Sequence, residues 1–220
     1  MHQLQPQPEV TTSLQLNYLS TSNSVDYLDR VHLAPWVISQ TEAQQVDWLI
    51  LHFNHWFSHL NVTLLKGDFE PEYFPATSNT FAKIQFAHGF FNSALHEISH
   101  WTIAGEKRRR LPDLGYWYAP DGRTAEQQAL FEQVEIKPQA IEWLFATAFG
   151  RKFRVSLDNL NGEGGDGCSF KDQVFAQVQR YFNGEAQLPR DAKHFIDCIC
   201  MCCRGGKTLQ SDEFYREMLD

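Results

Sequence analysis

The sequence predicts an α+β fold that is mostly helical, a single domain with a small β-sheet. The chain has 220 residues, of which 43% are hydrophobic and 14% aromatic, so it can bury a core of ordinary size. Segments with helical periodicity occupy most of the chain after residue 40, and the strand-like segments are short. Residues 1–40 are rich in Gln, Ser and Thr and are predicted to form a loosely ordered arm before a domain of residues 41–220.

The first half of the domain is predicted to hold one helix followed by two strands. The helix runs from Thr41 to about Leu60, because TEAQ at its start is typical of a capping box. The segments NVTLLKG and AKIQFAH, residues 61–67 and 82–88, are rich in β-branched and apolar residues and read as strands. Between them, DFEPEYFPATSN contains two prolines and is predicted to be a loop.

The second half is predicted to be helical apart from one further strand at residues 152–158. Helices are expected over residues 124–150, 170–181, 191–203 and 211–219. Four of the five cysteines fall in CICMCC, within the third of these helices, and are expected to be buried thiols instead of disulfides.

The charge and hydropathy of the chain exclude some classes of function. A formal net charge of −8 argues against a general nucleic-acid binder. No apolar run approaches the roughly 20 residues of a membrane helix. The N-terminal residues have neither a basic start nor an apolar core, so no secretory signal is expected and the protein is predicted to be cytoplasmic.

The segment HEISH carries the clearest chemical signal. On a helix His96 and His100 lie about 40° apart, one turn above the other, so both imidazoles can bind one metal ion. Glu97 lies beside that face and can point at a metal-bound water without being a ligand. Two buried histidines satisfied by hydrogen bonds are the alternative. The apolar residues gather on the opposite arc: Phe91, Leu95, Ile98, Trp101 and Thr102.

A third ligand is expected from the helix that contains FEQVEIKPQAIEW. Helical phase places Glu135, Gln139 and Glu142 within about 60° of one another, with Glu132 about 60° from Glu135. A solvated acidic face is the ordinary explanation of this pattern. If the helix supplies a ligand, Glu135 at the centre of the polar arc is the first candidate and Glu132 the second. Apolar residues occupy another arc: Leu130, Val134, Ile141 and Leu144.

Ligand types alone do not select the metal or the chemistry. A zinc peptidase with a zincin-like HExxH helix has two histidines and often a glutamate as third ligand. Two histidines and one carboxylate are equally the facial triad of non-haem iron oxygenases. A binding module that keeps a structural metal is a third possibility.

Longer blocks of sequence resemble the elongation factor P hydroxylase family. They are FAHGFFNSALHEISHWTIAGEKRRRLPDLGYWYAPDGR and FEQVEIKPQAIEWLF, and the similarity extends over roughly residues 42–205. The resemblance implies a metal centre built on the HExxH helix, with His96 and His100 as ligands. It also supports a carboxylate from the VEIKPQA helix as the third ligand.

The resemblance also implies a reaction. Members of this family hydroxylate a lysine of elongation factor P that has already received a β-lysyl group. On this basis the protein is expected to be a protein-lysine hydroxylase of the monooxygenase type, with iron(II) as its metal and dioxygen as co-substrate, because zinc has no redox chemistry. Glu97 would orient a ligand water or handle a proton. The expected partner is β-lysylated elongation factor P, without direct contact to nucleic acid or membrane; a zinc-dependent metallopeptidase is the alternative.

Residues around the motif are candidates for substrate binding. Tyr116, Trp117 and Tyr118 could wall a groove for a long cationic side chain, or simply pack on the core. His88 could line the same cavity or be a satisfied core histidine. The basic run at residues 107–110 suits either a solvated helix end beside the helix dipole or a docking patch for an acidic protein.

Overall fold

The computed structural model describes residues 40–116, 122–157 and 167–220. The strands are β1 (Val62–Lys66), β2 (Glu72–Phe74) and β3 (Ala82–Phe86). The helices of these ranges are α4 (Glu42–Trp56), α5 (Phe91–Ile103), α6 (Ala125–Ala148), α7 (Cys168–Phe182) and α8 (Arg190–Cys203). The described chain is therefore mostly helical with a small sheet, as predicted. Apart from Gln40, the predicted arm lies outside the described residues, and a domain boundary at residue 40 stays a prediction.

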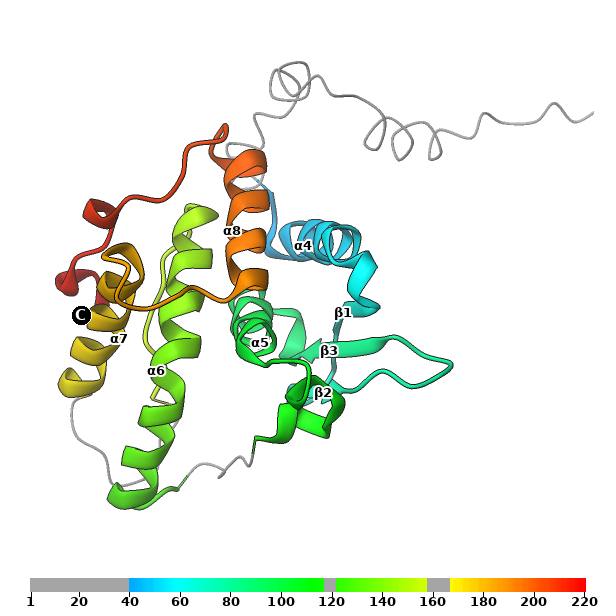
Figure 1. Cartoon of the computed structure of the whole chain (residues 1–220), viewed down its shortest axis with the longest axis horizontal. Helices are drawn as coiled ribbons and strands as arrows, with labels where there is room; N and C mark the ends of the chain where they lie inside the picture. Colours follow the sequence, from blue (N-terminus) through cyan, green and yellow to red (C-terminus); the bar gives the residue numbers. More distant parts are fainter. Residues whose placement is uncertain (1–39, 117–121, 158–166) are drawn as a thin grey trace, which may run out of the picture.

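The three strands form a sheet in the order β1-β3-β2. β1 runs parallel to β3, and β2 runs antiparallel to it. Alternate residues of β1 and β3 are buried, so one face of the sheet packs against the protein core. In Figure 1 this sheet lies beside α5, and β3 contacts that helix directly.

Helix α5 lies at the centre of the fold. It contacts α6 and α8 on one side and β3 on another, while α7 packs against α6 on the side away from the sheet (Figure 1). The capping box predicted at Thr41 is present and begins α4, which then contacts β1, α5 and α8. Because α5 is enclosed on several sides, its position is determined by packing against many partners.

Both ends of α5 are held by residues from other parts of the chain. At its N-terminus the carboxylate of Glu42, on α4, accepts a hydrogen bond from the backbone N–H of Phe91 at 3.0 Å. At its C-terminus Arg109 donates from Nε and Nη2 to the carbonyl oxygen of Trp101, at 3.1 and 2.9 Å. The guanidinium also lies over the Trp101 ring and pairs with Asp191 of α8 at 2.6 Å. These contacts satisfy backbone groups that a helix end leaves unpaired.

Strand β2 corrects one prediction, because it lies in the segment predicted to be a loop. It is only three residues long and sits between two prolines, so no alternation marks it in the sequence. Its middle residue, Tyr73, is held by distant partners. The Tyr73 N–H donates to Asp113 at 3.1 Å, and its hydroxyl donates to the carbonyl oxygen of Arg109 at 2.8 Å.

The strand predicted for residues 152–158 is wrong over its described part, residues 152–157, which pair with no strand. Their partner is instead a side chain of α6. The Gln139 amide donates to the carbonyl oxygen of Ser156 at 2.7 Å, and its oxygen accepts from the Ser156 N–H at 3.0 Å. One side-chain amide thus makes the two hydrogen bonds that a neighbouring strand would make.

The helix predicted for residues 211–219 is also wrong, since the segment forms two 3₁₀ turns, Ser211–Glu213 and Arg216–Leu219. The residues between the turns have extended backbone. Phe214 there is buried, and its ring packs edge-on against Trp143 at 5.3 Å between centroids. Burial of this side chain favours the extended conformation over a continuous helix.

The cysteines and the hydropathy of the helices bear on two further expectations. None of the five cysteines, all in the described residues, forms a disulfide; of the four in CICMCC, Cys200, Cys202 and Cys203 are buried as expected, whereas Cys198 is only partly buried. None of the helices in the described ranges is long and apolar enough to cross a membrane.

We predict that Arg109→Ala lowers the free energy of unfolding by about 2–3 kcal/mol, because the helix-end carbonyl of Trp101 loses its donor and the buried carboxylate of Asp191 keeps only its ion pair with the exposed Arg190. Arg110→Ala is the matched control, since Arg110 is exposed and its loss should cost less than about 0.5 kcal/mol. Urea unfolding of the three proteins measures both changes. Equal stabilities of the two variants would contradict the role given to Arg109.

Candidate metal centre

Helix α5 presents the two histidines of HEISH on one face, as predicted. The Nε2 atoms of His96 and His100 lie 3.1 Å apart. Residues on the opposite arc are buried, which anchors the helix in the core: Phe91, Leu95, Ile98, Trp101 and Thr102. The histidine side chains keep exposed fractions of 28% and 15%, so a small molecule can reach them.

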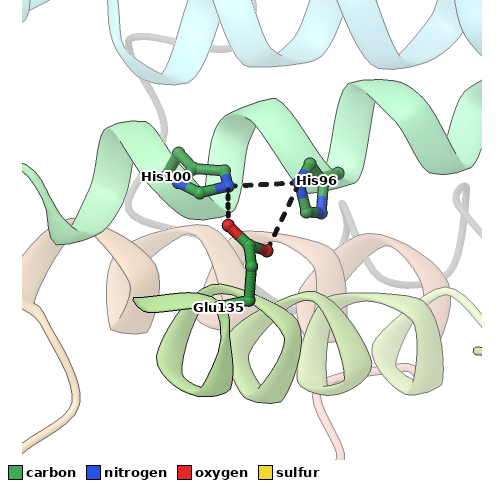
Figure 2. A group of neighbouring side chains, drawn as sticks. All are labelled: His96, His100 and Glu135. Carbon is green, nitrogen blue, oxygen red and sulfur yellow. Dashed lines mark hydrogen bonds and ion pairs between the residues drawn. The ribbon is translucent and has the colours of Figure 1, made fainter. Parts of the chain in front are cut away.

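Helix α6 places the carboxylate of Glu135 directly opposite the histidines (Figure 2). Glu135 Oε1 lies 3.2 Å from His100 Nε2, and Oε2 lies 3.7 Å from His96 Nε2. One ligand atom from each of the three side chains falls within 4.8 Å of the others. The structure thus brings together the three side chains proposed from the sequence, and their role as metal ligands stays a prediction.

The reserve candidate, Glu132, is not part of this group. Its carboxylate accepts a hydrogen bond from Gln128 at 3.1 Å, one turn earlier on the same helix. Glu135 therefore meets the histidines while Glu132 is engaged elsewhere.

The polar arc of α6 is buried, so its explanation as a solvated acidic face is wrong. Glu135, Gln139 and Glu142 have exposed fractions of 4%, 1% and 8%. The apolar arc is divided: Ile141 and Leu144 are buried, whereas Leu130 and Val134 are 64% and 51% exposed. The helix thus turns its acids toward α5 in the very region where an ordinary amphipathic helix would turn its apolar residues inward.

Two more residues of the arc contact the group, and the sequence did not assign them a role. Gln139 donates to Glu135 Oε2 at 3.4 Å, in addition to its hydrogen bonds with Ser156. His96 donates from Nδ1 to Glu142 Oε2 at 2.9 Å. Their spacing with Glu135 along one helix face was visible in the sequence, but which groups they contact depends on how α5 and α6 pack.

The charges in this group shift the pKa values of its members. Burial alone would lower the pKa of His96, but the hydrogen bond and charge of Glu142, with the charges of Glu135 and Glu97, raise it to about 10. Burial would raise the pKa of Glu135, but the neighbouring histidines and the Gln139 hydrogen bond lower it to about 2. Without a metal, His96 is therefore protonated and Glu135 ionised at neutral pH, and the two form an ion pair.

Glu97 differs from the other carboxylates of the site. Burial raises its pKa, while the charges of His96 and His100 act in the opposite direction and those of Glu135 and Glu142 add to the increase. The side chain interacts with both histidines through charge but is not a member of the three-residue group. A carboxyl with a raised pKa beside a metal site is suited to holding or transferring a proton.

Of the two proposed substrate-binding residues that lie in the described ranges, Tyr116 packs against the group. Its ring meets the His100 ring edge-on at 5.5 Å between centroids. The guanidinium of Arg108 lies 3.6 Å from the centre of the same ring, and it also donates to the carbonyl oxygens of Leu114 and Gly115. Arg108 therefore holds the Tyr116 ring in place and covers one of its faces. The basic run at residues 107–110 did not suggest this role in the sequence.

The other proposed substrate-binding residues receive no such support. His88 lies in the turn before α5, and its ring packs 6.1 Å from that of Phe90, not against the histidine pair. Trp117 and Tyr118 lie outside the described residues.

The geometry suits a metal bound by two imidazoles and one carboxylate. Two nitrogens that each lie about 2.0–2.1 Å from one ion are separated by about 3 Å when they are neighbouring ligands. The histidine nitrogens have this separation, and Glu135 Oε1 lies at a similar distance from His100. Three protein ligands leave further positions for small molecules, as in catalytic sites.

Comparison with known proteins identifies the family. The family described as Elongation factor P hydroxylase matches residues 52–214, well over half of the chain. A protein of Haemophilus influenzae named Elongation factor P lysine hydroxylase is 50% identical over 151 residues, which cover 68% of this chain and 84% of that protein. Neither match is to a peptidase, so the metallopeptidase alternative is not supported. The chain belongs to the elongation factor P hydroxylase family.

Proposed function

We propose that this protein hydroxylates the β-lysyl-modified lysine of elongation factor P, at a metal ion held by His96, His100 and Glu135. The observation that carries the proposal is the convergence of these three ligand atoms within 4.8 Å, in a chain of this family. The name of the relative gives the reaction, lysine hydroxylation, and the substrate, elongation factor P. The β-lysyl group comes from the resemblance noted in the sequence.

We propose iron(II) as the metal and dioxygen as the co-substrate. Two imidazoles and a carboxylate are the ligand set of non-haem iron oxygenases. Iron supplies the redox chemistry with dioxygen that hydroxylation requires, whereas zinc has none.

The residues around the three ligands bind the substrate side chain and orient a proton or a water molecule. Glu97 holds or transfers a proton, or orients a water, beside the histidines, since burial raises the pKa of its carboxyl. The buried carboxylates that face the site attract a cationic lysine side chain. Tyr116, held by Arg108, walls one side of the group.

The location and the partners of the protein follow from the same proposal. Modification of a translation factor takes place in the cytoplasm, and the net charge of −8 fits a protein that does not bind nucleic acid directly. Both statements stay predictions.

We predict that His96→Ala, His100→Ala and Glu135→Ala each abolish stoichiometric metal retention, because three ligands are needed and none of the three can be replaced by a neighbour. Most of the fold should persist, since the buried arc of α5 supplies its packing. Glu132→Ala is the matched control and should retain metal. Metal analysis of protein purified without oxygen, together with circular dichroism, measures both. Retention by the Glu135 variant and loss by the Glu132 variant would exchange their roles.

Metal affinity should increase with pH. The pKa of His96 is raised to about 10, so at neutral pH a proton occupies the ring and competes with the metal. Raising the pH removes this competition, and the apparent affinity should rise by at most about tenfold per pH unit for each proton displaced. Zinc titrations between about pH 6 and about pH 8 measure the slope. An affinity that is constant over this range would contradict the ion-pair description.

The activity itself should require both iron and dioxygen. Supplied with dioxygen and a two-electron reductant, iron-loaded protein should add the mass of one oxygen atom to β-lysylated elongation factor P, with the second oxygen atom released as water and no peptide bond cut, and zinc-loaded protein should not. Activity should decrease as salt screens the attraction between the site and a cationic side chain. Intact-protein mass spectrometry after incubation with and without oxygen measures the product.

The same experiment includes a direct test against hydrolysis. In a peptidase Glu97 would be the general base, so Glu97→Gln would remove cleavage while sparing the metal. Oxygen-independent cleavage that zinc supports and Glu97→Gln removes would overturn the hydroxylase proposal.

A further inference from the structure

We propose that Glu142 is a positioning residue for the metal centre: it accepts the Nδ1–H of His96 and so holds that ring with Nε2 directed at His100 and Glu135. The inference rests on the metal ligands of the proposed function, but not on the reaction that follows.

The two nitrogens of His96 have separate partners. Nδ1 lies 2.9 Å from Glu142 Oε2, while Nε2 lies 3.1 Å from His100 Nε2 and 3.7 Å from Glu135 Oε2. Figure 2 shows the second ring nitrogen of His96 outside the triangle of dashed lines. A neutral imidazole carries one N–H, and a carboxylate at Nδ1 fixes it there, which leaves the lone pair on Nε2 for a metal.

His96 needs such a partner more than His100 does. The His96 side chain is the more exposed of the two, at 28% against 15%. The His100 ring packs against Tyr116, which Arg108 in turn holds in place. Among the described residues, the ring contact recorded for His96 is with His100 itself. Packing can therefore orient His100, whereas a hydrogen bond must orient His96.

Glu142 is itself held rigidly enough for this role. It lies two turns after Glu135 on the same face of α6, so one helix supplies both the carboxylate ligand and the carboxylate that orients a histidine. Its exposed fraction is 8%, and its chain neighbours Ile141 and Trp143 are at 0% and 1%. Turning it away from His96 would leave a buried carboxylate without its partner, which is costly.

Glu142 is not a fourth member of the ligand group. In the described residues that group contains His96, His100 and Glu135. The oxygen of Glu142 bonds the ring edge that faces away from the other two ligand atoms. A residue in this position acts through the ligand, which is the arrangement that tunes metal affinity in many sites.

The test uses zinc binding to the full chain, with two variants that separate the hydrogen bond from the charge. Glu142→Leu removes the acceptor and should weaken zinc affinity about 10–100-fold. Glu142→Gln keeps an acceptor oxygen, so it should recover most of that loss. Glu132→Leu and Glu132→Gln are the matched controls, because Glu132 is a neighbouring acid of α6 that bonds Gln128 instead. Both controls should bind zinc as the wild type does.

A second measurement reports on the ring itself. In ¹⁵N NMR spectra of the zinc-bound protein, His96 should carry its proton on Nδ1 in the wild type and in Glu142→Gln. In Glu142→Leu the ring should lose this single form. Circular dichroism shows whether each variant is folded; if Glu142→Leu does not fold, Glu142→Gln with an unchanged His96 signal still supports the proposal.

Three outcomes would overturn it. Wild-type affinity and an unchanged His96 signal in Glu142→Leu would show that the hydrogen bond positions nothing. Equal losses of zinc affinity in Glu142→Gln and Glu142→Leu would show that the charge of Glu142, and not its hydrogen bond, supports metal binding. Failure of the wild type to bind zinc would remove the metal centre altogether. Zinc binding needs neither dioxygen nor elongation factor P, so a failure to observe hydroxylation leaves these results unaffected.

Discussion

The structure depends on burying acids and histidines together at the contact between α5 and α6. Glu135 and Glu142 are each less than 10% exposed, and a buried carboxylate without a partner would cost several kcal/mol. Their ionic partners in the described residues are His96 and His100, both on α5. This requirement determines the register of one helix on the other, because sliding either by one turn would separate all of these pairs. Apolar packing elsewhere holds the helices together, but the polar contacts select one arrangement.

The sequence predicted most of what is encoded locally. The capping box at Thr41 begins a helix, and the two main strands lie within a residue or two of their expected limits. The periodicity of α5 placed His96 and His100 on one face, and helical phase selected Glu135 over Glu132. These features depend on spacing along one element, and spacing can be read without knowing the partner.

The wrong predictions concern segments whose structure depends on contacts with distant parts of the chain. The side chain of Gln139 makes both hydrogen bonds with the backbone of Ser156, so the strand-like segment of residues 152–157 pairs with a side chain instead of a strand. Phe214 is buried in a way that interrupts a helix-like segment. The acids of α6 appear solvated when the helix is considered alone, because acidic residues are usually exposed. Their burial follows from the histidines of another helix, and no pattern within α6 contains that information.

The order of the ligands along the chain has a consequence for biosynthesis. The two histidines leave the ribosome first, on a helix that also needs α6 and α8 to cover it. Glu135 emerges later, and only its docking completes the set of three. A nascent chain can therefore display an incomplete pair of imidazoles but not a finished site. A metal held by all three side chains would therefore reach its full set of protein ligands only after α6 has packed on α5, which would couple metal binding to folding.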